Sequence, residues 1–125
     1  MSDSITTFFD AWGMSDDAAR AAAISTTFAS EGTYTDPRSS GTLTGPEAIT
    51  EYVTAFSANA PGWTAQVTKL DQTGPYARAT VTFGGKGPDG SEMKQNGQYF
   101  AKLDGDTITE MVGFVGTGEL SGAFE

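Results

Sequence analysis

The stretch YTDPRSSGTLTGPEAITEYVTAF, residues 34–56, decides the fold because it joins a short strand to a well-marked helix through a fixed turn. A proline pushes the residue before it toward extended backbone, so Asp36 is predicted to lie at a strand end with a set direction. After a loop, residues 44–47 (TGPE) match a helix capping box with proline in the first turn. The apolar stripe of the helix that follows is formed by Ile49, Tyr52, Val53 and Phe56.

Two further helices are predicted before this stretch. The first carries a stripe of apolar residues at helical spacing, namely Ile5, Phe8, Phe9 and Trp12. The second begins at Ser15, the predicted N-cap, and runs through an alanine-rich segment to about Phe28. The sequence after Gly62 alternates as strands do and predicts four antiparallel strands at about 63–70, 76–83, 93–103 and 107–115.

Helices followed by a meandering sheet indicate an α+β architecture. We expect three N-terminal helices packed on one strongly curved, mixed or antiparallel sheet, with a conical cavity between the two layers. Residues 1–125 are expected to form a single domain, with a helical part at about 4–58, a sheet part at about 63–116 and a loose tail at 117–125. Gly97 and Gly113 interrupt strand patterns and suggest bulges or bends that help the sheet to curl.

Composition narrows the function classes. The net charge of −9 and the seven scattered basic residues argue against nucleic acid or an anionic membrane as a partner. The sequence has no cysteine and no histidine, so thiolate chemistry is excluded and a metal site is not expected. The N-terminal residues carry no basic region and no apolar signal core, and no apolar run reaches the ~20 residues of a membrane span, which predicts a cytoplasmic protein.

The ordered set of these features resembles the nuclear-transport-factor-2-like superfamily, in its SnoaL-like and ketosteroid-isomerase-like branch. The resemblance covers nearly the whole chain and rests on Phe28 eight residues before Asp36, on the strand end at 34–37 and on the helix from Gly45 to Phe56. It implies a cystatin-like α+β barrel that commonly pairs through its sheet, so a homodimer is expected. The fold hosts isomerases, polyketide cyclases, dehydratases and non-catalytic binding modules, so it does not by itself choose the function.

Asp36 is the candidate catalytic residue. In ketosteroid isomerases an aspartate directly before a proline is the general base, and Asp36 matches that position. Aligning the family's two enolate stabilisers puts Phe9 or Phe8 in one place and Gln98 in the other. Phenylalanine donates no hydrogen bond and an amide is a weaker donor, which argues against a true steroid isomerase. The competing interpretation is that Asp36 is a turn former whose carboxylate accepts backbone hydrogen bonds around Pro37.

The remaining candidates are pocket residues. Asn96 and Gln98 share one strand face and are predicted to point into the cone as amide donors to a carbonyl or hydroxyl group. Residues predicted to line the pocket are Phe9, Trp12, Tyr34, Phe56, Trp63, Asn96, Gln98, Met111 and Val115. The leading hypothesis is a protein that binds a small hydrophobic or carbonyl-bearing molecule, with possible isomerase, cyclase or dehydratase activity and no cofactor. The alternative is a non-catalytic ligand-binding or dimeric scaffold protein of the same fold.

Overall fold

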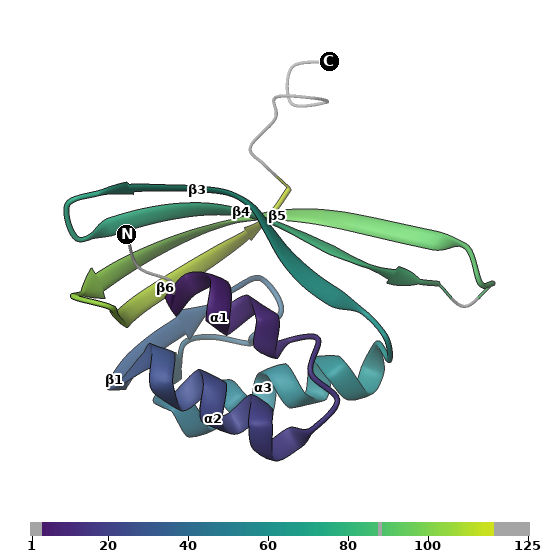
Figure 1. Cartoon of the computed structure of the whole chain (residues 1–125), viewed down its shortest axis with the longest axis horizontal. Helices are drawn as coiled ribbons and strands as arrows, with labels where there is room; N and C mark the ends of the chain where they lie inside the picture. The colour runs from purple at the N-terminus through teal and green to yellow at the C-terminus, as the bar shows by residue number, and fades with distance from the viewer. Residues whose placement is uncertain (1–3, 88, 117–125) are drawn as a thin grey trace.

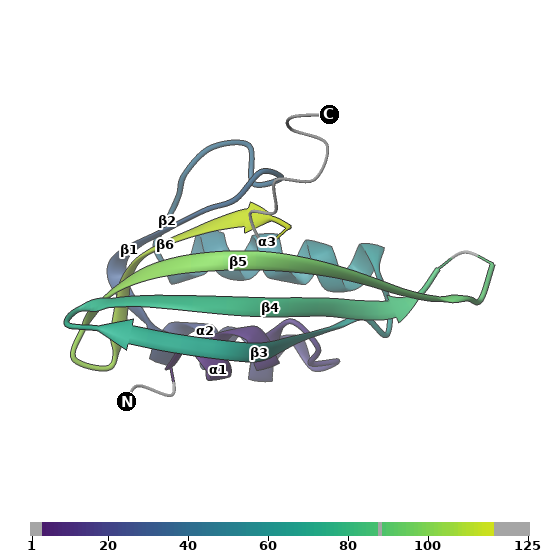
Figure 2. The same ribbon diagram turned by 90° about the horizontal axis from the view of Figure 1, so that it is seen from above.

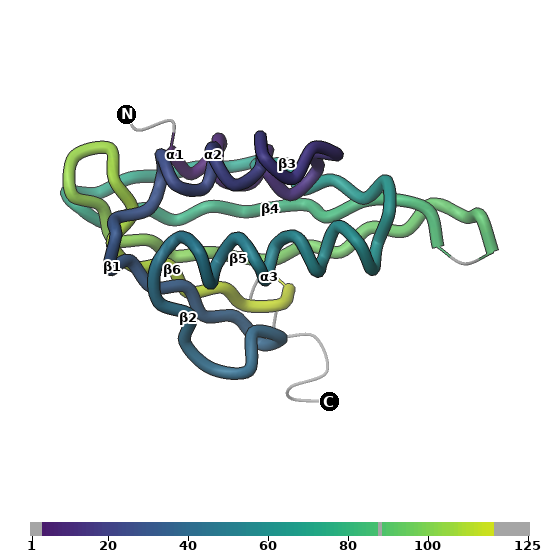
Figure 3. The backbone as a smooth tube through the Cα atoms, turned by 90° about the horizontal axis from the view of Figure 1, so that it is seen from below, coloured from purple at the N-terminus to yellow at the C-terminus, as the bar shows by residue number. Residues whose placement is uncertain are grey.

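Three helices cover one face of a single sheet (Figures 1 and 3). A computed structural model of the chain describes residues 4–87 and 89–116, so the predicted tail at 117–125 lies outside the described residues. The helices are α1 (Ser4–Ala11), α2 (Asp17–Thr27) and α3 (Pro46–Asn59). The spacing of hydrophobic residues predicted α1 and α3, and the cap and alanine-rich segment predicted α2.

The helix starts differ from prediction in detail. The N-cap of α2 is Asp16 rather than Ser15, and its carboxylate accepts a hydrogen bond from the amide of Ala19 at 3.2 Å. At α3 the N-cap is Gly45, with a positive φ of 89° and no side-chain cap, so the predicted capping box did not form. Pro46 does occupy the first turn, where its missing N–H costs no hydrogen bond.

The sheet has six strands in the order β2-β1-β6-β5-β4-β3. The strands are β1 (Phe28–Thr35), β2 (Leu43–Thr44), β3 (Thr64–Thr73), β4 (Tyr76–Lys86), β5 (Glu92–Asp104) and β6 (Thr107–Val115). All neighbours are antiparallel except β1 and β6, which are parallel. The predicted α+β class with a curved mixed sheet is therefore confirmed, although the sheet is not closed into a barrel (Figure 2).

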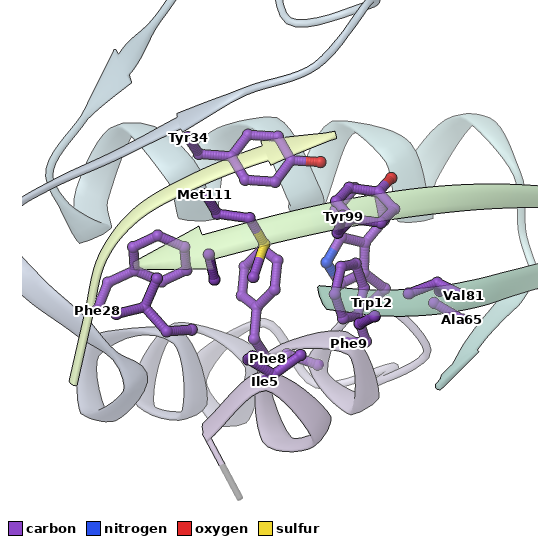
Figure 4. Packing of buried hydrophobic residues seen from close by; sticks show 14 of the residues in the cluster. Ile5, Phe8, Phe9, Trp12, Phe28, Tyr34, Ala65, Val81, Tyr99 and Met111 are labelled. Carbon is purple, nitrogen blue, oxygen red and sulfur yellow. The ribbon is translucent and has the colours of Figure 1, made fainter. Parts of the chain in front are cut away.

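The core lies between the helices and the inner face of the sheet (Figure 4). Tyr99 crosses this face at a point where two glycines make room for its ring. A Cβ on Gly113, which is paired directly with Tyr99, would lie 2.3 Å from the ring, and one on Gly97 would lie 3.1 Å from it. The strand register shifts elsewhere, between Val67 and Lys69 and between Lys102 and Leu103. The two glycines thus admit a side chain rather than mark the expected bulges.

The hairpin formed by β4 and β5 extends past the end of the helical layer (Figures 1 and 2). Trp63 packs against the end of β4 in this arm. Its indole N–H donates to the carbonyl of Lys86 at 3.1 Å, and its ring packs so closely on Gly85 that a Cβ there would lie 2.4 Å away. Residues of β5 in this arm, among them Met93 and Gln95, line the pocket that also contains Trp63.

Candidate functional site

Asp36 lies directly after β1, where a tight turn fixes its backbone. The Asp36 amide donates to the hydroxyl oxygen of Ser39 at 3.0 Å, and the Ser39 amide donates to the Asp36 carbonyl at 3.2 Å. The amide of Arg38 donates to the Asp36 carboxylate at 2.8 Å. Ser39 is buried and Pro37 restricts the backbone between them, so the direction of the carboxylate is set by local sequence.

Two tyrosines donate their phenolic hydrogen bonds to this carboxylate. Tyr34 of β1 reaches Oδ2 at 2.6 Å, and Tyr52 of α3 lies 2.8 Å from both carboxylate oxygens. Tyr34 is fully buried, whereas Tyr52 is half-buried and faces the adjoining pocket. Since a phenol has one proton to donate, both tyrosines are committed to Asp36 and present only lone pairs elsewhere.

A third tyrosine completes the polar group. The hydroxyl of Tyr99 lies on the same side of the core as that of Tyr34, as Figure 4 shows, and the two rings are 6.4 Å apart. Burial raises the pKa of Tyr34, Tyr52 and Tyr99 above the usual 10.0. The negative charge of Asp36 raises the pKa of all three further. All three phenols are therefore neutral donors at physiological pH.

The raised pKa values of these tyrosines predict alkaline sensitivity. Above about pH 10 the unfolded chain loses phenolic protons that the folded chain keeps, so the free energy of unfolding is expected to fall as pH rises. The slope for each retained proton is ~1.4 kcal/mol per pH unit. Urea unfolding between about pH 9 and about pH 11 measures it. Tyr34→Phe is expected to give a shallower slope than wild type, and an equal slope in both proteins would contradict this assignment.

No basic side chain is paired with Asp36. The ion pairs within residues 4–87 and 89–116 join Arg20 to Asp17 and Arg78 to Asp71. Arg38 follows Asp36 closely in sequence, but its guanidinium donates to the side-chain carbonyl of Gln95 at 3.3 Å. This contact links the loop after β1 to β5. The donors to the carboxylate within residues 4–87 and 89–116 are thus two phenols and one backbone amide.

Asp36 forms the polar end of a pocket of about 340 Å³. The aromatic residues along its wall are Trp12, Tyr52, Phe56, Trp63, Phe83, Tyr99 and Phe114. The other residues along it are Pro37, Arg38, Ala60, Met93, Gln95, Asn96, Gly97 and Val115. A mostly aromatic cavity that also holds a carboxylate is typical of a site for a small organic molecule.

The structure brings together some of the predicted site residues and separates others. Those along the pocket are Asp36, Trp12, Phe56, Trp63, Asn96 and Val115. Phe9, Tyr34 and Met111 are instead fully buried in the core. Gln98 is a correction, because it shares the outer face of β5 with exposed Phe100 while Tyr99 points inward. The predicted inward face of β5 was therefore wrong, and Asn96 borders the pocket although its side chain also turns outward, toward Thr82.

Sequence reasoning did not identify Tyr52, Tyr99 or Phe83 as pocket residues. A usable pattern existed on β5, where Tyr99, Ala101 and Leu103 alternate as the buried residues of β4 do. Matching those two alternations would have turned Tyr99 inward. In the described part of the chain no group of three carboxylates could hold a metal ion. None of the described helices is long and apolar enough to cross a membrane.

A cone of three helices and a curved sheet, with an acid at the end of an aromatic pocket, defines a class of small-molecule-binding domains. Residues 5–111 match the model of the SnoaL-like domain, and the chain belongs to that family. No curated protein matches the sequence significantly.

Solved structures agree on the fold. A candidate isomerase of the SnoaL-like family from Agrobacterium tumefaciens str. C58 has 22% identity and a TM-score of 0.77, with 91% of this chain and 95% of that chain covered. A protein with a ketosteroid isomerase-like fold from Catenulispora acidiphila DSM 44928, in complex with trimethylamine, has 22% identity, a TM-score of 0.75 and coverage of 90% and 85%. IdmH, a candidate polyketide cyclase from Streptomyces antibioticus, has 16% identity, a TM-score of 0.76 and coverage of 90% and 89%.

Proposed function

We propose that this SnoaL-like protein binds a small hydrophobic carbonyl compound and moves a proton next to its carbonyl, with Asp36 as the general base. The carboxylate takes a proton from the carbon beside the carbonyl, the electron pair moves onto the carbonyl oxygen, and the proton returns at another position. Isomerisation, aldol cyclisation and dehydration all begin with this proton abstraction: the enolate is then reprotonated elsewhere, attacks a second carbonyl or expels a β-hydroxyl group as water. The reaction would need only side chains of this chain and no cofactor.

The observation that carries this proposal is the position of Asp36. Its carboxylate lines an aromatic pocket, and in the described residues it is held by phenols and a backbone amide without an ion-pair partner, so its negative charge is not neutralised. Asn96 adds no donor there, because its side chain lies on the outer face of the sheet, where its Oδ1 accepts a hydrogen bond from Thr82 at 2.8 Å. The candidate isomerase and cyclase among the structural neighbours, and the neighbour that holds trimethylamine, support a small organic ligand.

A thermal-shift screen of hydrophobic ketones on wild type and Asp36→Asn tests the function. A ligand at ten times its Kd stabilises the folded state by ~1.4 kcal/mol, which raises Tm by a few degrees. We expect ketones that bind both proteins and are converted only by wild type. Binding without conversion by either protein would overturn the catalytic part, and no stabilisation across the panel would overturn the binding part.

The second candidate function is a non-catalytic binding or scaffold protein. The backbone amide of Arg38 caps the Asp36 carboxylate at 2.8 Å, which is the contact expected of a turn former. Both the catalytic and the non-catalytic function predict that Asp36 variants change the stability of the turn. Only the catalytic function predicts a chemical product. Conversion in the screen above therefore separates them.

We also propose a homodimer formed through the outer face of the sheet. Tyr76, Phe100 and Phe114 are 58%, 42% and 54% exposed, and the last two stack edge to face with centroids 5.9 Å apart. Exposed aromatic side chains gathered on a sheet face are typical of an interaction surface. Light scattering of wild type is expected to give twice the chain mass and that of Phe100→Lys the single mass. A single mass for wild type at every concentration would contradict the dimer.

A further inference from the structure

We propose that the indole N–H of Trp12 is the hydrogen-bond donor that holds the carbonyl oxygen of the ligand. This inference rests on the proposed function and assigns the ligand a polar orientation inside the same pocket. The starting observation is chemical: among the described residues, the Trp12 Nε1 is the buried side-chain nitrogen or oxygen without a hydrogen-bond partner. Buried donors are nearly always satisfied, so one that is not calls for an acceptor that arrives from outside.

The surroundings of Trp12 leave a ligand as that acceptor. Trp12 follows α1, is 2% exposed and lines the pocket. Aromatic rings enclose its indole, with ring centroids 5.0 Å away for Phe56, 5.4 Å for Phe83 and 6.0 Å for Tyr52. The faces of such rings are poor acceptors for an N–H.

The second tryptophan shows the contrast within the same pocket. Trp63 also lines the cavity, but its indole N–H is satisfied by the carbonyl of Lys86 at 3.1 Å. Its donor therefore belongs to the structure of the hairpin arm. The chain has only these two tryptophans. The indole N–H of Trp63 thus stabilises the hairpin, whereas that of Trp12 has no hydrogen-bond acceptor in the described residues.

The position of Trp12 fits the proposed chemistry. Its indole lies beside the ring of Tyr52, whose hydroxyl contacts both carboxylate oxygens of Asp36 at 2.8 Å. A carbonyl held by Trp12 therefore lies at the same end of the pocket as the base. Tyr34 and Tyr52 donate their protons to Asp36, which leaves Tyr99 as the competing phenol along the pocket. The ligand class is then a largely apolar, ring-containing ketone or related carbonyl compound that enters with its oxygen toward Trp12.

The test uses the two indole signals of the ¹⁵N-labelled protein, assigned with Trp63→Phe. The probes are 1-tetralone and tetralin, which share the same bicyclic frame and differ in the carbonyl oxygen. We expect 1-tetralone to move the Trp12 indole proton downfield in a saturable way, and tetralin to cause a much smaller change. The ketone is expected to bind about tenfold more tightly than the hydrocarbon. In Trp12→Phe, checked to be folded by its melting curve, this preference is expected to disappear.

Each outcome bears on a different claim. If both compounds bind and shift the Trp12 signal alike, or shift only the Trp63 signal, the donor role is wrong while the pocket still binds ligands. If neither compound moves either signal or raises Tm, the proposed small-molecule function fails together with this inference. If the ketone preference survives in Trp12→Phe, another donor holds the carbonyl and the assignment is overturned.

Discussion

Replacing Arg20 with methionine is expected to lower the free energy of unfolding by about 2–6 kcal/mol. Arg20 is 1% exposed, and its guanidinium joins all three helices. It donates to the carbonyl of Ala11 at 3.1 Å and to the hydroxyl of Ser57 at 2.9 Å. Further acceptors are the Met14 carbonyl, the Thr54 hydroxyl and the Asp17 carboxylate. Methionine fills similar space but removes the guanidinium donors to the Met14 carbonyl and to the Ser57 hydroxyl, and it leaves the Ala11 carbonyl with the Met14 amide as donor. The loss is a large part of an ordinary domain's stability.

Arg78→Met is the matched control for this prediction. Arg78 also forms an ion pair, with Asp71 at 2.8 Å, but both side chains are about half exposed, so its removal is expected to leave stability near the wild-type value. Urea unfolding of both variants provides the comparison. If Arg20→Met does not fold, Ser57→Ala removes a single acceptor and allows a milder loss to be measured. Equal stability of Arg20→Met and Arg78→Met would contradict the structural role of Arg20.

Changing Asp36 to asparagine is expected to slow proton transfer by about 10²–10⁴-fold. The amide oxygen of asparagine can still accept from Tyr34 or Tyr52, so the local structure is expected to persist, but an amide cannot take up the proton. The rate with a ketone found in the screen measures the effect. Asp71→Asn makes the same chemical change on exposed β3 and is expected to turn over at the wild-type rate.

A fall in turnover shared by Asp36→Asn and Asp71→Asn would point to a general effect of charge and contradict the assignment. A wild-type rate in Asp36→Asn, with binding intact, would remove Asp36 from the chemistry. In that case the tyrosines would hold Asp36 for structural reasons only.

Much of the fold was readable from the sequence because local periodicity carries it. The stripe from Ile49 to Phe56 faces the core in α3, and Ala77 to Phe83 alternate as a half-buried strand should. The parallel pairing of β1 with β6 was not readable, since it joins segments far apart in the chain. Local patterns carry no information on which distant strands meet.

The site was only partly predictable for the same reason. Asp36 stood out because the proline after it fixes the backbone locally. Its partner Tyr52 was read as part of a core stripe, and contact with Asp36 depends on how α3 packs against the end of β1. The role of Arg20 was equally hidden, because its acceptors Ser57 and Thr54 lie on another helix. The side chain of Gln98 was predicted to point inward because β5 carries polar and apolar residues on both faces. A shift of one residue in the alternation exchanges the inner and the outer face.

The most direct test of the central claim is deuterium exchange at the carbon beside the carbonyl of 1-tetralone, followed by NMR in D₂O. This exchange is the proposed proton transfer itself and does not require the natural substrate. We predict that wild type accelerates the exchange and that Asp36→Asn, which still binds the ketone, does not. Exchange at the same accelerated rate in both proteins, or no acceleration by wild type at a ketone concentration that saturates the pocket, would contradict Asp36 as the general base.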